Sequence, residues 1–292
     1  MFRLPSEQIP GVYHRRVGDL TVTAVCDGYL YPPVDIVQGI SEAETVQMMV
    51  AGQGYPTIRA SINVFAIRSE DRTVLVDAGC GSTLGTTCGR LCDNLAKAGI
   101  ALDSVHAVLL THIHPDHSNG LTTADGEAVF ANAEVIVHEA EIAYWLDDAV
   151  MALADERARS RYFAAARFCL APYRDRIRTF TAGEVLPGIV GLPSHGHTPG
   201  HVAYRISSAG EDMLFWGDTV HVPELQVPRP DITVRYDVDQ ARAAFSRQAI
   251  FDILLRDNLV VAGAHLHFPG FARLSRTDGS YRLLPEPWAH TL

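Results

Sequence analysis

Residues 111–117 have the sequence THIHPDH, which places three imidazoles and one carboxylate within six consecutive positions. The apolar run directly before them, VHAVLL at residues 105–110, is too short for a helix, so we expect a buried strand there. The histidine cluster is therefore predicted to lie on the loop that follows a buried strand.

The spacing within this loop predicts the start of two metal sites. Alternate residues of an extended chain point the same way, so His112 and His114 can face one ion. Asp116 and His117 lie beyond the bend at Pro115 and can face another. Neither set is complete, because a catalytic zinc usually takes three protein ligands and keeps one position for water.

Three later segments can supply the missing ligands, and each adjoins a predicted strand. They are SHGHTPGH at residues 194–201, WGD at 216–218 and GAH at 263–265. Their candidate donors are His197, Asp218 and His265.

This order of an HxHxDH motif, an HTPGH segment, a GD dipeptide and a late histidine resembles the metallo-β-lactamase superfamily, over about residues 20–288. The resemblance implies an α/β fold, an αββα sandwich. It also implies that His112, His114 and His197 hold a first metal ion and that Asp116, His117 and His265 hold a second, with Asp218 bridging both.

The expected cofactor is therefore a pair of divalent ions, most simply zinc, although manganese, cobalt and iron accept overlapping ligand sets. Two ions about 3.5 to 4 Å apart can share a hydroxide that attacks a polarised C=O or P=O group. Metal binding lowers the pKa of water from about 15.7 to roughly 7, so no serine or cysteine nucleophile is needed. We expect Asp116 to take or relay a proton as well.

Within that superfamily the sequence resembles the methyl parathion hydrolases, through LLTHIHPDH at residues 109–117, SHGHTPGH at 194–201 and AHLHFPG at 264–270. The resemblance implies a small-molecule substrate, a neutral ester, lactone or phosphotriester. It also implies a substrate pocket flanked by Trp145 and Phe163, with Leu84 where those enzymes carry a further aromatic. Plain core packing would explain Trp145 and Phe163 equally well.

Acyl-homoserine lactonases are the alternative, because they share the metal ligands. They carry a catalytic tyrosine three residues after the bridging aspartate, where this chain has His221. His221 is therefore a candidate catalytic residue that would stabilise an oxyanion. Organophosphate turnover would then be incidental to a native lactone or ester activity.

Two other classes are less well supported. The same ligands suit a di-iron redox protein, but the chain has no room for an appended flavin domain. A non-catalytic metal sensor would be expected to lose ligands that this chain retains. Asp77, at the end of a predicted strand, either orients a ligand imidazole or stabilises a turn.

The rest of the chain indicates one globular unit. Its 292 residues have 47% hydrophobic and 20% charged side chains, without repeats or linkers. We expect a single domain over residues 1–292, with an N-terminal arm within residues 1–55. Strands are expected at 20–26, 62–67, 73–76, 105–110, 134–137, 177–180, 189–192, 202–206, 213–216 and 259–262, and helices at 85–98, 139–146, 152–170 and 239–256.

Charge and composition limit the partners. A formal net charge of −10 without a basic run argues against nucleic-acid binding, and no apolar stretch approaches the roughly 20 residues of a membrane span. Residues 1–10 lack the apolar core of a secretory signal, so we expect a cytoplasmic protein.

The five cysteines are expected to be free thiols, with a metal site at Cys80, Cys88 and Cys92 as a minor alternative. A homodimer is the expected assembly, because closed dimers are the commonest oligomers.

Overall fold

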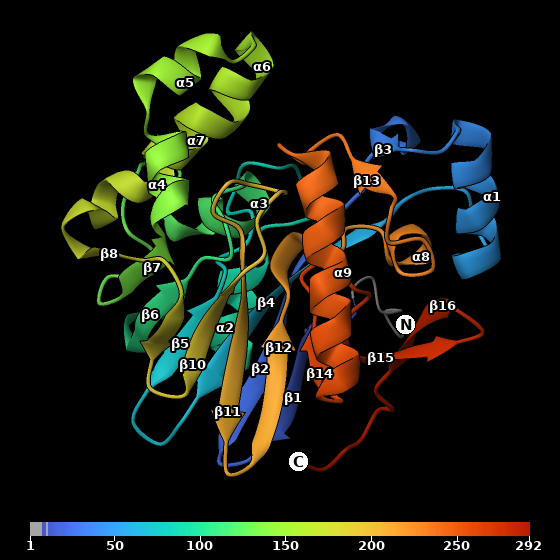
Figure 1. The fold of residues 1–292 in the computed structure, drawn as a ribbon. Coiled ribbons are helices and arrows are strands. Elements are labelled where there is room, and N and C mark those ends of the chain that lie inside the picture. The colour runs from blue at the N-terminus through green and yellow to red at the C-terminus, as the bar shows by residue number, and fades with distance from the viewer. Residues whose placement is uncertain (1–7, 10) are drawn as a thin grey trace, which may run out of the picture.

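The computed structural model describes residues 8, 9 and 11–292, and its centre is two seven-stranded sheets packed face to face (Figure 1). In spatial order the first sheet consists of β1 (Val12–Val17), β2 (Leu20–Leu30), β4 (Ala60–Arg68), β5 (Thr73–Val76), β6 (Val105–Leu109), β7 (Glu134–His138) and β8 (Ile177–Phe180). The second consists of β16 (Ser280–Pro285), β15 (Phe271–Thr277), β14 (Val260–Ala262), β12 (Glu211–Phe215), β11 (Val202–Ser208), β10 (Ile189–Pro193) and β9 (Gly183–Leu186). A separate short pair joins β3 (Val37–Gln38) to β13 (Thr233–Val234).

Helices cover the outer faces of both sheets. The α-helices are α1 (Glu42–Gln53), α2 (Leu91–Lys97), α3 (Pro115–Ser118), α4 (Glu139–Trp145), α5 (Asp148–Leu153), α6 (Glu156–Ala158), α7 (Ala164–Leu170), α8 (Pro223–Gln226) and α9 (Gln240–Arg256). A π-helical turn, η4 (Arg159–Phe163), joins α6 to α7. The 3-10 turns are η1 (Val34–Ile36), η2 (Leu102–Ser104), η3 (Asn119–Leu121), η5 (Ala171–Arg176) and η6 (Gly217–Thr219).

Three apolar layers hold this arrangement together. Between the sheets, the Phe65 ring lies 5.4 Å from that of Phe215 and 5.5 Å from that of Phe271. A second layer lies beneath α2, α4 and α7 on the first sheet, and a third beneath α9 on the second. Strands covered on both faces must be apolar on both, as the fully buried β5 is. These layers confirm the predicted αββα sandwich.

The strand directions bring distant loops to one edge of the sandwich. β5 and β6 are parallel neighbours in the first sheet, and β12 and β14 are parallel neighbours in the second. Parallel strands end at the same edge of a sheet, so the loops that follow these four strands can meet there. The three later segments predicted to bind metal, residues 194–201, 216–218 and 263–265, also adjoin this edge.

The helix predictions were wrong at three places. No helix was expected before residue 85, but residues 29–60 contain α1, whose only buried side chains are Thr45 and Met49, too few to give a helical period. Ser41 caps its start and Gly54 ends it in a left-handed conformation, which was the available signal. The expected helix at 152–170 is broken into α5, α6, η4 and α7, and the helix expected at 85–98 begins only at Leu91.

Two strand predictions were also incomplete. β2 does not end at residue 26, as expected, but continues to Leu30 through a bulge, where Gly28 has φ +139° and an added Cβ would lie 2.2 Å from the Thr87 carbonyl oxygen. The β15–β16 hairpin was missed, although Asp278 and Gly279, both with positive φ, are the residues that a two-residue hairpin loop favours.

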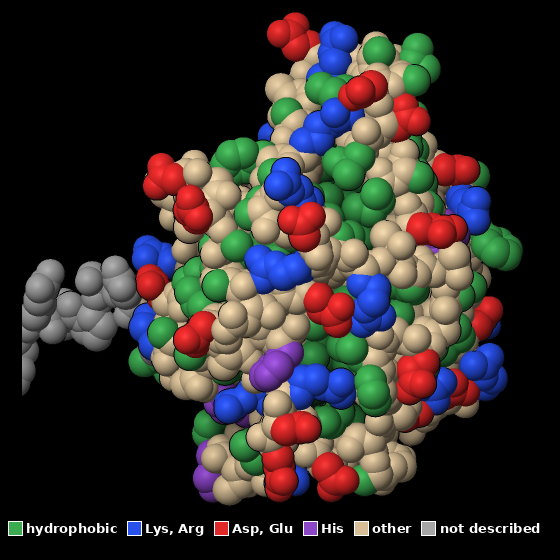
Figure 2. Space-filling model, turned by 90° about the vertical axis from the view of Figure 1, so that its left-hand side faces the viewer, with side chains coloured by type: hydrophobic (Ala, Val, Ile, Leu, Met, Phe, Trp, Pro, Cys, Tyr) green, Lys and Arg blue, Asp and Glu red, His purple; other side chains and the backbone are tan. Residues whose placement is uncertain are grey.

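The N-terminal region is more integrated than an arm. β1 and β2 form one side of the first sheet, and only η1, β3 and α1 stand apart, packed on α8 and β13. The prediction about a secretory signal concerns residues 1–10, of which 1–7 and 10 lie outside the described residues. Within the described part, no helix has the length and apolarity needed to span a bilayer. On the face in Figure 2, acidic and basic side chains are interspersed.

The cysteines do not form a metal site in the part of the chain that the structure describes. All five are free thiols, as predicted, with Cys80 and Cys88 buried and Cys92 exposed. Within the described part of the chain, every cluster of potential metal ligands consists of histidine and aspartate alone. The cysteine alternative therefore has no support here.

Candidate metal centre

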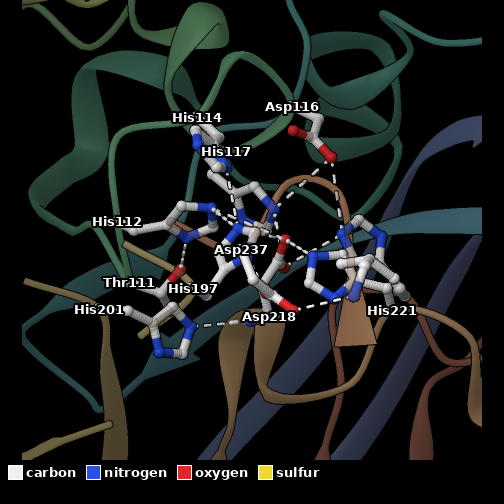
Figure 3. A network of polar contacts seen from close by, with 12 residues as sticks. Thr111, His112, His114, Asp116, His117, His197, His201, Asp218, His221 and Asp237 are labelled. Carbon is white, nitrogen blue, oxygen red and sulfur yellow. Dashed lines mark hydrogen bonds and ion pairs between the residues drawn. The ribbon is translucent and has the colours of Figure 1, made fainter. Parts of the chain in front are cut away.

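The seven predicted metal ligands meet at the edge where the parallel strands end. The first sheet supplies four of them, from the loop after β6 and from α3, and the second sheet supplies three, before β11 and after β12 and β14. In Figure 3 the labelled side chains of His112, His114, Asp116, His117 and His197 converge around Asp218. The two groups that they form are His112, His114, His197 with Asp218, and Asp116, His117 with His265.

The first half-site consists of the three imidazoles of His112, His114 and His197. The Nε2 atom of His197 lies 3.2 Å from Nε2 of His112 and 2.9 Å from Nδ1 of His114. Oδ2 of Asp218 lies 3.7 Å from His112 Nε2 and 3.3 Å from His197 Nε2. One cation at the centre of this group would contact three neutral nitrogens and one carboxylate oxygen.

The second half-site consists of Asp116, His117 and His265. Oδ2 of Asp116 lies 3.6 Å from His117 Nε2 and 3.5 Å from His265 Nε2. The other carboxylate oxygen of Asp218, Oδ1, lies 2.9 Å and 3.1 Å from the same two nitrogens. Each oxygen of Asp218 thus faces its own half-site, which is the geometry of a bridging ligand.

Unpartnered polar atoms fit this donor set to metal ions. His117 Nε2 and Asp218 Oδ1 are buried and have no hydrogen-bond partner. Buried polar atoms without partners are rare, because each costs about 1 to 3 kcal/mol. A divalent cation between them would satisfy both, and imidazole with carboxylate is a ligand set that zinc accepts.

The two half-sites differ in their proton affinity. Burial lowers the pKa of His112, His114 and His197 well below the ordinary value. Burial also acts on His117 and His265, but Asp218 and Asp116 outweigh it and raise the pKa of both. Burial would raise the pKa of Asp218, yet the surrounding imidazoles, led by His117, hold it well below its usual value.

Four ligand imidazoles are oriented through the ring nitrogen that faces away from the centre. Nδ1 of His117 lies 2.8 Å from Asp77 Oδ2, and Nδ1 of His197 lies 2.9 Å from Asp237 Oδ1. Nδ1 of His112 bonds Thr111 Oγ1 at 3.1 Å, and that of His265 bonds the Ser61 carbonyl at 2.8 Å. A proton held on each Nδ1 leaves each Nε2 free as a metal ligand.

Asp77 is a positioning residue rather than only a turn residue. It accepts hydrogen bonds from the Thr111 backbone N–H and hydroxyl, as well as from His117. Its φ of +65° is a left-handed conformation that a non-glycine residue adopts at a cost of about 1 kcal/mol or more. Both alternatives considered for Asp77 therefore hold, since it shapes the loop and orients the ligand.

Three further residues that sequence reasoning missed connect the ligand segments. His201 accepts a hydrogen bond from the Asp218 backbone N–H at 2.9 Å, and its own Nδ1 bonds the Ser194 carbonyl. The buried carboxylate of Glu141 accepts from the backbone N–H groups of Ile113 and Gly200, both at 2.8 Å. His201 lies in the quoted HTPGH segment, whereas nothing in the local sequence marks Glu141 or Asp237.

A cavity opens over the metal centre. Leu84, which the resemblance places beside the substrate, contributes to its wall. Trp145 and Phe163 do not, because both are buried in the core beneath the helices. Trp145 Nε1 donates to Glu141 at 2.9 Å and its ring lies edge-on to His114, so it supports the first half-site from behind.

His221 lies against the bridging carboxylate. Its Nε2 is 2.8 Å from Asp218 Oδ2, and its ring stacks on that of His265 at 5.5 Å. The side chain lines the cavity, and neither ring nitrogen has a hydrogen-bond partner. His221 therefore contacts both the bridging carboxylate and the cavity.

The sequence and fold match known proteins. A family model described as "Metallo-beta-lactamase superfamily" matches residues 58–265. A curated relative, acyl-coenzyme A thioesterase MBLAC2 of Gallus gallus, is 30% identical over 174 residues, which cover 54% of this chain. The match spans only 57% of the length of that relative.

Solved structures agree over nearly the whole chain. Hydrolase AbOPH, described as a member of the β-lactamase superfamily, is 30% identical, with a TM-score of 0.90 over 97% of this chain and 100% of its own. AidC, described as a dizinc quorum-quenching lactonase, has the same TM-score and coverage at 21% identity. At this identity the match shows similarity of fold alone. The enzyme class that these matches support is a metal-dependent hydrolase.

Proposed function

Because this chain belongs to the metallo-β-lactamase superfamily, we propose that it is a hydrolase that uses two divalent ions, zinc in the first instance, to cleave a neutral ester, lactone or phosphotriester. The observation that carries the proposal is Asp218, whose two oxygens face separate half-sites. Bound divalent ions lower the pKa of water and polarise a C=O or P=O group.

The protein's own residues would position the substrate and handle protons. Asp116 has a side chain 19% exposed and lines the cavity, so it can accept a proton from a water molecule at the centre. His221 would donate a hydrogen bond from its ring to the oxygen that gains negative charge. Leu84 would contact the apolar part of the substrate.

The test is metal analysis of the purified protein, together with hydrolysis of a substrate panel. The panel contains aryl phosphotriesters, aryl esters, homoserine lactones, acyl thioesters and a β-lactam. We expect close to two metal equivalents and a turnover that a chelator abolishes and added metal restores. Full turnover after complete metal removal would contradict the proposal, and bound iron without hydrolysis would favour the redox alternative.

Lactonase activity is the second candidate, and His221 is the residue that separates it from the first. A tyrosine at this position would resemble the acyl-homoserine lactonases. We expect His221→Ala to lower kcat by about tenfold or more with metal content unchanged, because one oxyanion donor is lost. We expect His221→Tyr to raise the ratio of lactone to phosphotriester turnover. A ratio that stays constant in both variants would remove His221 from the chemistry.

A further inference from the structure

The rim of the cavity carries a set of hydrogen-bond donors that the proposed hydrolysis does not use. Arg161, Tyr162 and Tyr236 line the cavity together with the metal-binding side chains. Arg161 and Tyr162 come from the π-helical turn η4, and Tyr236 comes from the loop between β13 and α9. π-Helical turns occur frequently at functional sites.

The Arg161 guanidinium has no carboxylate partner among the described residues. Arg167, in α7, pairs with Asp148 at 2.8 Å, and Arg178, in β8, pairs with Glu134 at 3.0 Å. Arg161 forms no such pair, although the chain has 34 acidic and 24 basic side chains. An unpaired cation in the wall of a binding cavity is available to a ligand.

The two tyrosines extend this set of donors. Burial raises the pKa of Tyr162 and of Tyr236, so both phenols keep their protons. Their hydroxyls and the Arg161 guanidinium belong to side chains that line the same cavity. The Tyr162 ring lies 5.0 Å from that of His114, so this rim adjoins the first half-site.

Another part of the cavity wall is apolar. Leu30, Ile36 and Leu84 line it, from the end of β2, from η1 and from the loop before α2. A ligand that fills the cavity therefore meets an apolar surface and a cationic, donor-rich surface. Such a division orients a molecule that has one apolar and one charged part.

We infer that the substrate carries an anionic oxyacid group, a carboxylate or a phosphate, which binds Arg161 and the hydroxyls of Tyr162 and Tyr236. Its apolar part contacts Leu30, Ile36 and Leu84. The bond that is cleaved remains that of an uncharged ester, thioester or lactone elsewhere in the same molecule. This inference rests on the proposed function and specifies its substrate class.

Matched substrates test it with the metal-loaded enzyme. 4-Nitrophenyl butyrate is compared with mono-4-nitrophenyl glutarate, whose acyl chain ends in a carboxylate. The butyryl thioester of N-acetylcysteamine is compared with that of coenzyme A, which adds phosphates. We expect Arg161→Gln to lower kcat/KM about fivefold to tenfold for one anionic substrate and less than about twofold for the neutral ones. A loss confined to the glutarate ester would identify the bound group as a carboxylate, and a loss confined to the coenzyme A thioester would identify it as a phosphate.

Arg159→Gln is the matched control, because it removes the same charge from the same turn at a residue outside the cavity wall. In each matched pair, Arg159→Gln should leave the ratio of kcat/KM for the anionic substrate to kcat/KM for the neutral substrate unchanged. Equal losses in the two variants would mean a general charge effect and would overturn the inference. No change in Arg161→Gln would overturn it as well, while the hydrolase proposal would stand.

A binding measurement keeps the inference testable if no substrate of the panel is cleaved. Glutarate, phenyl phosphate and neutral glutaramide are titrated calorimetrically into the metal-loaded wild type and both variants. Any contact between these ligands and the metal ions is common to all three proteins. We expect one of the two anions to bind about fivefold more weakly to Arg161→Gln alone. Equal affinities in wild type and Arg161→Gln would overturn the inference, whatever the activity.

Discussion

The two half-sites share Asp218 but differ in the state of their other ligands. The first half-site has three imidazoles, none more than 5% exposed, whose pKa values burial lowers. The second has two imidazoles whose pKa values are raised by carboxylates, and its third ligand, Asp116, is 19% exposed. The imidazoles on the two sides of Asp218 therefore have pKa values shifted in opposite directions.

This difference matters because protons compete with metal ions for imidazole nitrogens. The first half-site presents nitrogens that burial keeps neutral. The second attracts a cation through the charge of Asp116 but must release protons to bind it. We therefore expect the second half-site to hold its ion less persistently and to exchange it through the cavity.

The largest expected effect removes what the half-sites share. In Asp218→Ala, four or more imidazoles lose the carboxylate that faces them, so we expect both ions to bind weakly and kcat/KM to fall on the order of 10³-fold. Metal analysis after gel filtration and steady-state kinetics measure this. Retention of one full metal equivalent would show that one half-site is independent of the bridge.

The next comparison removes one ligand from each half-site. His265→Ala should lower occupancy of the second half-site and hydrolysis together, and leave about one ion in the protein. His197→Ala should lower occupancy of the first half-site instead. The metal content of each variant and the pH at which it loses its remaining ion distinguish the two variants. A His265→Ala protein with both metals and full activity would contradict the assignment.

A smaller effect appears on acidification. The raised pKa values of His117 and His265 mean that protons bind there first as pH falls, while His112, His114 and His197 resist protonation to lower pH. Between about pH 8 and pH 5 we expect stepwise loss, with the second ion leaving first. Metal analysis after dialysis at each pH follows it. Simultaneous loss of both ions would remove the distinction between the half-sites.

The smallest expected effect tests the support behind the first half-site. Trp145→Phe removes the hydrogen bond to Glu141 and should lower the free energy of unfolding by about 1 to 2 kcal/mol. Trp216→Phe is the control, because the buried Nε1 of Trp216 has no partner to lose. Urea denaturation measures both. Equal destabilisation would mean that packing, and not the bond to Glu141, explains the loss.

The convergence of the seven candidate ligands could be predicted from sequence because four of them lie in one short loop and the others follow apolar strands. The sandwich was predictable for a related reason, since strands such as β5 and β6 are apolar on both faces. Both patterns lie in short stretches of sequence, so they can be recognised without knowledge of the tertiary contacts.

The supporting residues were not predictable in this way. Asp237 bonds the ring of His197, 40 residues away, and Glu141 accepts from the backbone of Ile113, 28 residues away between two ligands, so no local pattern marks either residue. Trp145 and Phe163 are aromatic residues on helical segments, and sequence does not say whether such a residue faces a cavity or the core. The break at η4 decides this, because it directs Tyr162 to the cavity and Phe163 inward.

The distribution of the ligands over both sheets has a consequence for how the molecule comes apart. The loop after β6 and the segments beside β11, β12 and β14 belong to opposite halves of the sandwich. An ion held by His112 and His197, or by His117 and His265, is therefore a cross-link that must break before the sheets separate. Occupied protein should unfold much more slowly than stripped protein, and its lifetime under heat should follow the rate of metal release.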